Sequence, residues 1–376
     1  LPDQSVLHLP FPGLLLPGDA IEIAISFTGQ IPENSTTYGI YNFDPDVMTI
    51  ALANSFPILA SHIRNGWGME EIQPFGDAVT SDTSLFHVTI EMPQDWQIAT
   101  SGIALSVSQH NGSSISEFVS GPMRDFMIVA SPNFTVYEEI SEGVTIRQWA
   151  LPDNESEQAA ALETVSQATI LFSNLYGEYP YNEMDIVSIH LNNASGVEYP
   201  GLILMEQMLY PPNSHDLNRL AMVIAHEVAH QWWYALVGND VQNDPWLDES
   251  LATYASLVYM DSINPDYGAG ARQFFREAVT TFENSLKPPG YRIADPLIKY
   301  RNDSNAYALI VYRKGALFLD ALNKEIGQEV FSAALVDYFT QNKFQLAEPA
   351  SFLNVFEARC ECDLTAFYKE WGILLP

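Results

Sequence analysis

Basic residues are scarce in this sequence. Its 376 residues include 16 Lys and Arg against 47 Asp and Glu, which gives a formal net charge of −31 at pH 7 and a pI near 4.3. Such a surface repels the phosphates of nucleic acids and anionic lipids, so we expect neither as a partner. The acidity suits a substrate that carries a free amine, although it can equally serve solubility alone.

Cysteines and long apolar runs are also scarce. The only two cysteines, Cys360 and Cys362, are one residue apart and match neither a CxxC redox motif nor a paired zinc-ligand pattern. We therefore expect two free thiols rather than a local disulfide. No apolar run approaches the roughly 18–20 residues that a membrane span needs. The chain opens at Leu1 without a basic leader, which is typical of a processed chain. We favour an extracellular or cell-envelope location over a cytoplasmic one.

The residue pattern changes near residue 150, which predicts two domains, 1–150 and 151–376. The first part alternates apolar and polar residues between turns and predicts an antiparallel, sandwich-like β domain. Its expected strands include 21–27, 85–92, 103–107, 125–130 and 144–149. The second part is an α+β region that is mostly helical. It has expected strands at 186–191 and 202–205 and expected helices at 153–176, 216–236, 248–262, 265–284, 305–325, 327–341, 349–359 and 363–371.

One helix carries a pattern that suits a metal. His226 and His230 are four residues apart, so both imidazoles project from one face of the helix and can bind one cation. Glu227 follows the first histidine and can act as a general base on a water at that cation. Two unrelated helix histidines are the alternative, but a purely structural helix of alanine and valine would bury this carboxylate unfavourably. The motif therefore predicts a zinc site.

A third metal ligand is expected at the start of the next helix. The run 246–252 reads Trp-Leu-Asp-Glu-Ser-Leu-Ala, and eighteen residues separate His230 from Glu249. A helix–loop–helix return of this length can bring Glu249 beside the histidines. Asp248 is the competing candidate, but it suits a helix N-cap or a supporting acid better.

This combination resembles the zinc aminopeptidases of the gluzincin clan, the family of membrane alanyl aminopeptidase and leukotriene hydrolase. The likeness rests on the His226–Glu249 spacing, on the Gln-Trp-Trp run at 231–233, and on 312–316, which read Tyr-Arg-Lys-Gly-Ala where the family has Tyr-x-Lys-Gly-Ala. Residues 76–77 (Gly-Asp) and 96–102 extend it into the β region. The resemblance covers most of the chain and is strongest from 196 to 316.

The resemblance implies an N-terminal β domain followed by a thermolysin-like catalytic domain with zinc between two helices. The family's β domain is usually longer, so we expect this chain to start partway into it. The implied activity is zinc-dependent hydrolysis of N-terminal residues from peptides, with one Zn²⁺ per chain. The implied site residues are the metal ligands His226, His230 and Glu249, the general base Glu227, the oxyanion donor Tyr312, the α-amine ligand Glu198 and a second substrate-binding residue, Tyr307.

Some of these residues have alternative interpretations from the sequence alone. Glu198 lies in 195–199, where the family has Gly-Ala-Met-Glu-Asn, and only the glutamate matches clearly, because Tyr199 replaces the asparagine. Without the resemblance, Glu198 reads as a solvated surface acid and Tyr312 as a core residue. Three arginines could anchor a substrate carboxylate, and nothing in the sequence selects among them: Arg272, Arg276 and Arg301.

Two other functions stay open at this point. The chain could be a zinc endopeptidase or another hydrolase on the same scaffold, since the family includes an epoxide hydrolase. It could also be a non-catalytic peptide-binding relative that keeps the fold.

Overall fold

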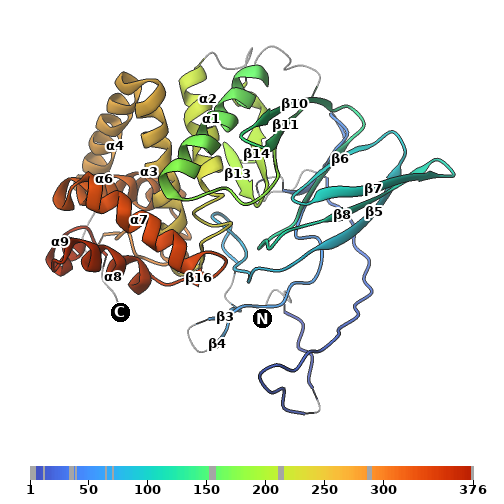
Figure 1. Cartoon of the computed structure of the whole chain (residues 1–376), viewed down its shortest axis with the longest axis horizontal. Helices are drawn as coiled ribbons and strands as arrows, with labels where there is room; N and C mark the ends of the chain where they lie inside the picture. Colours follow the sequence, from blue (N-terminus) through green and yellow to red (C-terminus); the bar gives the residue numbers. More distant parts are fainter. Residues whose placement is uncertain are drawn as a thin grey trace.

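A computed structural model of the chain describes residues 6–11, 13–33, 38, 40–63, 66–69, 72–151, 158–210, 216–285 and 290–373. Figure 1 shows strands gathered on one side of the molecule and helices on the other. An antiparallel β region followed by a mostly helical region is the predicted fold class, which is confirmed.

The N-terminal region contains two antiparallel sheets and a short hairpin. The four-stranded sheet has the order β1 (Tyr41–Asp44), β2 (Thr49–Ala53), β9 (Met127–Ser131) and β6 (Gln97–Thr100). The three-stranded sheet has the order β5 (His87–Pro93), β8 (Ser113–Val119) and β7 (Ile103–His110). The hairpin pairs β3 (His62–Ile63) with β4 (Gly66–Trp67).

A five-stranded mixed sheet joins this region to the helices. Its order is β10 (Thr135–Ser141), β11 (Val144–Ala150), β12 (Glu183–Ile189), β14 (Leu202–Glu206) and β13 (Gly196–Tyr199). Strands β11 and β12 pair in parallel, as do β12 and β14. The sheet therefore continues across the predicted domain boundary after residue 150, and the division into two domains there stays a prediction.

Both faces of this sheet are covered, which explains why β12 and β14 are almost continuously apolar. Side chains alternate along a strand. Ile186 and Ile203 belong to the large core beneath the helices, whereas Val187 and Leu204 pack with the core of the four-stranded sheet. The sheet is thus the middle layer between helices and strands, and its β13 edge faces the helix that carries the two motif histidines (Figure 1).

The helices follow one another closely along the chain. They are α1 (Gln158–Tyr176), α2 (Leu217–Ala229), α3 (Trp246–Ile263), α4 (Pro265–Ser285), α5 (Ser304–Tyr307), α6 (Gly315–Ile326), α7 (Gln328–Asn342), α8 (Pro349–Cys360) and α9 (Thr365–Glu370). A π-helical segment, η4 (Ala308–Lys314), connects α5 to α6. Short 3-10 turns (η2, Gln207–Leu209; η3, Leu297–Tyr300) and a parallel pair of two-residue strands (β15, Gly238–Asn239; β16, Leu346–Ala347) complete the elements. None of the described helices combines the length and the apolar composition that a bilayer crossing requires.

The helix predicted over 216–236 ends earlier than expected. Helix α2 stops at Ala229, and His230 is its C-cap residue. Beyond it the chain turns, with a positive φ of 132° at Tyr234. The apolar pattern continues past the helix because these turn residues are themselves buried in the core. The first five residues of the helix predicted at 153–176 lie outside the described residues.

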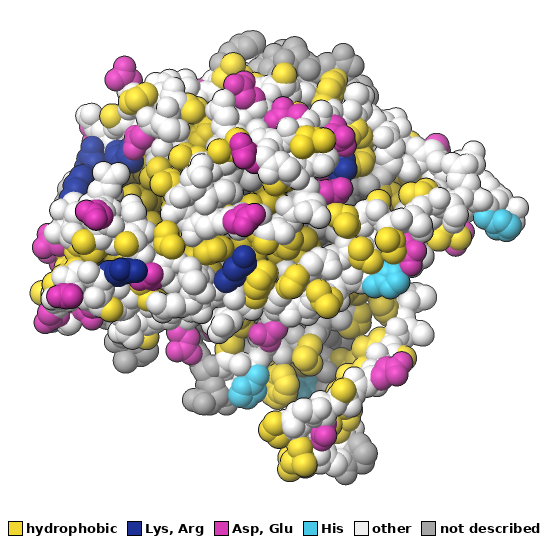
Figure 2. All heavy atoms as spheres, viewed as in Figure 1, with side chains coloured by type: hydrophobic (Ala, Val, Ile, Leu, Met, Phe, Trp, Pro, Cys, Tyr) yellow, Lys and Arg dark blue, Asp and Glu magenta, His cyan; other side chains and the backbone are white. Residues whose placement is uncertain are grey.

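The strand predicted over 21–27 is wrong, because this segment forms no ladder. Its large apolar side chains are 41–59% exposed. They belong to the extended N-terminal segment, drawn in dark blue in the lower part of Figure 1, and Figure 2 shows apolar side chains on the surface of the same lower part of the molecule. Alternation alone does not make a strand, because backbone groups must also find a partner strand.

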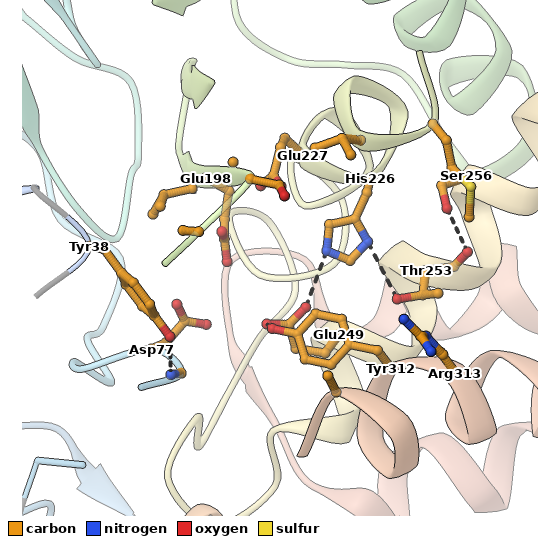
Figure 3. Close-up of a pocket in the computed structure, with 18 of the residues that line it drawn as sticks. Tyr38, Asp77, Glu198, His226, Glu227, Glu249, Thr253, Ser256, Tyr312 and Arg313 are labelled. Carbon is orange, nitrogen blue, oxygen red and sulfur yellow. Dashed lines mark hydrogen bonds and ion pairs between the residues drawn. The ribbon is translucent and has the colours of Figure 1, made fainter. Parts of the chain in front are cut away.

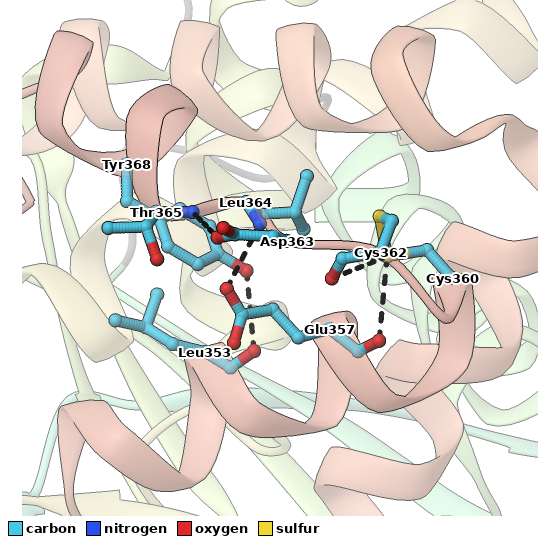
Figure 4. Close-up of a disulfide and its surroundings, with 8 residues drawn as sticks. All are labelled: Leu353, Glu357, Cys360, Cys362, Asp363, Leu364, Thr365 and Tyr368. Carbon is cyan, nitrogen blue, oxygen red and sulfur yellow. Dashed lines mark hydrogen bonds between the residues drawn. A yellow bond between two sulfur atoms is a disulfide. The ribbon is translucent and has the colours of Figure 1, made fainter.

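The expectation of two free thiols is also wrong. Cys360, at the end of α8, and Cys362 form a disulfide with a Cα–Cα distance of 5.1 Å (Figure 4). Glu361 between them has a positive φ of 52°, which ends the helix and lets the two side chains meet. No residue pattern around Glu361 indicates this backbone conformation, so the cysteine spacing alone led to the wrong expectation.

Candidate active site and metal centre

Helix α2 presents two imidazoles side by side. The Nε2 atoms of His226 and His230 lie 3.1 Å apart. His230 is fully buried, and its Nδ1 lies 3.0 Å from the carbonyl oxygen of Trp233. That carbonyl is available because α2 has just ended, and its contact with Nδ1 leaves Nε2 free to face the site.

Helix α3 brings a carboxylate to the same point. Oε2 of Glu249 lies 3.3 Å from Nε2 of His226 and 3.4 Å from Nε2 of His230. Its other oxygen accepts a hydrogen bond from the hydroxyl of Tyr312. Burial raises the pKa of Glu249, but the hydrogen bonds to His226 and His230 outweigh burial and bring it down to about 2.

These three residues fit a bound divalent ion. Their ligand atoms all lie within 4.8 Å of one another. Oε2 of Glu249 is buried, and its only close polar neighbours among the described residues are the two imidazole nitrogens at 3.3 and 3.4 Å, so an ion between the three atoms would satisfy it. Two imidazoles and one carboxylate are a donor set that catalytic zinc takes, leaving a fourth position for water or substrate.

Asp248, the competing ligand candidate, lies outside this group. Its Oδ2 accepts a hydrogen bond from Nδ2 of Asn239 at 3.0 Å, and its Oδ1 accepts one from the backbone N–H of Glu249 at 2.6 Å. Asp248 is therefore placed to hold the first turn of α3 in position, as a supporting acid would.

Glu227 and Glu198 face each other across the edge of β13. Glu198 is only 7% exposed, and its Oε1 lies 3.7 Å from Nδ1 of His230. Burial raises the pKa of Glu198 to about 7, although the neighbouring His230 opposes the rise. Burial, followed by the charge of Glu198, raises the pKa of Glu227 well above its ordinary value. The interpretation of Glu198 as a solvated surface acid is therefore wrong.

Gly196 on β13 makes this approach possible. A Cβ atom at this position would overlap the carboxylate of Glu227. The close packing of α2 against β13 therefore depends on a residue without a side chain here. This close packing holds the Glu227 carboxylate next to Glu198.

The segment η4 supplies the tyrosine. Tyr312 lies with its ring 5.8 Å from the ring of His226 in a stacked arrangement. Tyr307 is buried behind it, with ring centroids 5.3 Å apart, and is absent from the residues that line the cavity. The structure thus brings Tyr312 to the candidate metal ligands and leaves Tyr307 as a support for that ring. π-helical turns often occur at functional sites.

The cavity around these residues has a volume of about 430 Å³ and opens to solvent. Figure 3 shows Tyr38 and Asp77 on the side of Glu198, and Thr253, Ser256 and Arg313 on the far side of His226. Its remaining walls come from α2, α3, α4, η4, β13 and the loop before β13.

Tyr38 and Asp77 were not predicted as site residues. The hydroxyl of Tyr38 accepts a hydrogen bond from the N–H of Gly76 at 2.6 Å, which places Asp77 at the cavity wall. Burial and the charge of Glu198 raise the pKa of Asp77 well above its ordinary value. The Gly76-Asp77 pair was visible only as a turn and as part of the family resemblance. No local signal marked Tyr38.

Comparison with known proteins identifies the family. Residues 160–371 match the peptidase family M1 domain, so the chain belongs to peptidase family M1. It is 23% identical over 360 residues to aminopeptidase M1-A of Oryza sativa subsp. japonica, which covers 93% of this chain and 40% of the relative. It is 26% identical over 308 residues to mitochondrial aminopeptidase 2 of Saccharomyces cerevisiae, covering 79% of this chain and 31% of that protein.

A third relative, aminopeptidase N of Canis lupus familiaris, is 26% identical over 245 residues, 61% of this chain and 25% of that protein. The matches with these three relatives thus cover 25–40% of their lengths. The predicted resemblance to the zinc aminopeptidases is confirmed at the level of the family.

Proposed function

We propose that this chain is a zinc-dependent aminopeptidase that removes N-terminal residues from peptides, with one zinc ion per chain. The proposal is carried by one juxtaposition. The buried carboxylate of Glu198 lies next to His230, on one side of the group formed by His226, His230 and Glu249. An amine bound by Glu198 would therefore leave room for only one residue before the scissile carbonyl reaches the metal site.

The roles of the residues follow from their positions. A zinc ion held by His226, His230 and Glu249 would supply Lewis acidity toward the scissile carbonyl and toward a water. Glu227, next to His226 on α2 and lining the cavity, takes the proton of the attacking water and passes it to the leaving amine. The hydroxyl of Tyr312 donates a hydrogen bond to the developing oxyanion, a contribution of roughly 3–4 kcal/mol in comparable sites.

Glu198 selects for a free N-terminus. Its Oε1 is buried and accepts no hydrogen bond from any residue that the structure describes, so a substrate ammonium would supply the missing donor. Its charge also complements the cation. The three relatives compared above are named aminopeptidases, which supports the same role here.

Paired peptides test this proposal. The purified protein should cleave a free-amine peptide such as Leu-Gly-Gly and leave its N-acetylated form intact, and a chelator should abolish the cleavage. Equal cleavage of both forms would identify an endopeptidase. Metal-bound protein that cleaves neither form would identify a peptide-binding relative.

We also propose an extracellular or cell-envelope location. The Cys360–Cys362 disulfide supports it, because disulfides persist mainly in oxidising compartments. Fractionation of the source cells should recover the protein outside the cytoplasm, and recovery in the cytoplasm with free thiols would contradict this.

A further inference from the structure

The cavity runs along helix α2, and its two ends carry opposite charge. Five residues of α2 line it: Arg219, Met222, Val223, His226 and Glu227. Glu198 lies near His230, at the C-terminal end of the helix, and Arg219 lies seven residues before His226. At 1.5 Å per residue, Arg219 is about 10 Å along the axis from His226, in the direction away from Glu198.

A second arginine reaches the same end from another element. Arg313 is on η4, directly after Tyr312, and lines the cavity with Phe275. Its guanidinium carbon lies 5.0 Å from the ring centre of Phe274 and 5.6 Å from that of Phe275. These rings hold the side chain beside Thr253, on the far side of His226 from Glu198 (Figure 3).

Arg313 lacks a carboxylate partner in the part of the chain that the structure describes. By contrast, its neighbour Lys314 contacts Glu283 at 2.6 Å, and Arg272 contacts Asp261 at 2.6 Å and Asp320 at 3.3 Å. Burial lowers the pKa of Arg313, and no acidic neighbour raises it. In a chain with 47 acidic residues, a half-buried arginine without an acid, facing the cavity, is available for an external carboxylate.

The other arginines considered from the sequence are not placed to bind a substrate carboxylate in this cavity. Arg272 is held by its two aspartates. Arg276 and Arg301 are exposed, and neither lines the cavity. The structure therefore selects a residue that the sequence did not single out, at the variable position of the Tyr-x-Lys-Gly-Ala motif.

We propose that Arg313, with Arg219 at the rim, binds a carboxylate of the substrate on the leaving-group side of the scissile bond. The proposal rests on the aminopeptidase function proposed above, and it names the substrate class as short peptides with a free C-terminus. An extended peptide spans about 3.3–3.6 Å per residue, so two residues beyond the scissile bond reach about 7 Å from His226 toward Arg219, and three residues reach about 10 Å. Tripeptides and tetrapeptides fit this length.

The first test compares substrates that differ in one charge. The kcat/KM values of Leu-Gly-Gly and its C-terminal amide are measured for the wild type and for Arg313→Gln. A charge-assisted pair predicts a wild-type preference for the free acid of roughly 10- to 100-fold. The preference should fall to below about 3-fold in Arg313→Gln. Arg313→Met keeps an apolar stem over the phenylalanine rings, and its preference for the free acid should fall as far as that of Arg313→Gln.

The matched control is Arg276→Gln, an exposed arginine on the neighbouring helix α4 that does not line the cavity. It should keep the wild-type preference. A second pair of substrates, the C-terminal amides of Leu-Glu-Gly and Leu-Gln-Gly, tests whether Arg313 binds a side-chain carboxylate of the substrate instead of its C-terminal carboxylate. The proposal is overturned if neither pair shows a preference, or if the preference survives both Arg313 variants.

A binding measurement separates this inference from the proposed function. Calorimetry with the zinc-loaded Glu227→Gln variant gives Kd for the acid and amide of Leu-Gly-Gly without turnover. The same preference of roughly 10-fold or more is expected there, and its absence overturns the inference. Failure of the wild type to cleave Leu-p-nitroanilide, which has no carboxylate, would instead contradict the aminopeptidase function.

Discussion

The hydroxyl of Ser250 donates a hydrogen bond to the backbone carbonyl of Val311 at 2.7 Å. Ser250 follows Glu249 on α3, and Val311 precedes Tyr312 on η4. The bond therefore ties the two segments that carry a candidate metal ligand and the candidate oxyanion donor. This hydrogen bond requires α3 and α6 to lie close together. Gly315 permits the close approach because it has no Cβ, and a Cβ at this position would overlap the Ser250 side chain.

Gly315→Ala should weaken both the fold and the site. The added methyl group would push α6 away from α3, and overpacking of this kind destabilises by roughly 1–3 kcal/mol. Urea unfolding measures the effect. The control is Gly270→Ala in α4, where the new Cβ would meet no atom within 4 Å, so stability should stay equal or rise by roughly 0.5–1 kcal/mol. Equal stability of both variants would contradict the close packing.

Asp125 should make stability fall as pH rises. Burial raises its pKa to about 6, although a hydrogen bond from Asn54 opposes the rise. Between about pH 4 and pH 6 the folded state keeps a proton that the unfolded state has lost, so the free energy of unfolding decreases across this range and then levels off.

Asp125→Asn should remove this dependence, because the amide oxygen can still accept from Asn54 and no charge is buried. We expect the variant to gain roughly 1–3 kcal/mol over the wild type at pH 7 and little at pH 4. Urea unfolding at several pH values measures the difference. A constant difference at every pH would show that Asp125 does not titrate in this range.

Glu227→Gln should abolish turnover and keep the metal. The amide cannot accept the proton of the attacking water, so kcat should fall by roughly 10²- to 10⁴-fold or more. Zinc content, measured by atomic absorption, should match the wild type because Glu227 is not one of the three proposed ligands. Retained activity would refute its role as the base.

Tyr312→Phe should lower kcat more than it changes KM. Loss of one oxyanion donor reduces kcat by roughly 10²- to 10³-fold. Steady-state kinetics on a free-amine peptide measures the changes in kcat and KM separately. The matched control is Tyr307→Phe, since Tyr307 is absent from the cavity lining, and a much smaller loss is expected there. Equal losses in the two variants would contradict the assignment of Tyr312.

The sequence was most informative where a pattern is local. The spacing of His226 and His230 follows from helix geometry alone, and the fold class follows from the change of pattern near residue 150. The end of α2 was missed because the turn that follows is as apolar as the helix. The disulfide was missed because it depends on the positive φ of Glu361.

Residues that reach the site from distant segments could not be predicted. Tyr38 and Asp77 come from the N-terminal region, far along the chain from His226, and only the packing of that region beside β13 brings them together. Arg313 was visible in the sequence, but its direction toward the cavity depends on the π-helical turn and on the rings of Phe274 and Phe275.

Anomalous diffraction at the zinc absorption edge, from crystals of the purified protein, tests the metal site directly. We expect one ion per chain, between α2 and α3, with metal–ligand distances of about 2.0–2.2 Å to Nε2 of His226, Nε2 of His230 and a carboxylate oxygen of Glu249. Zinc-saturated crystals with no anomalous peak there, or with an ion held by other residues, would contradict it.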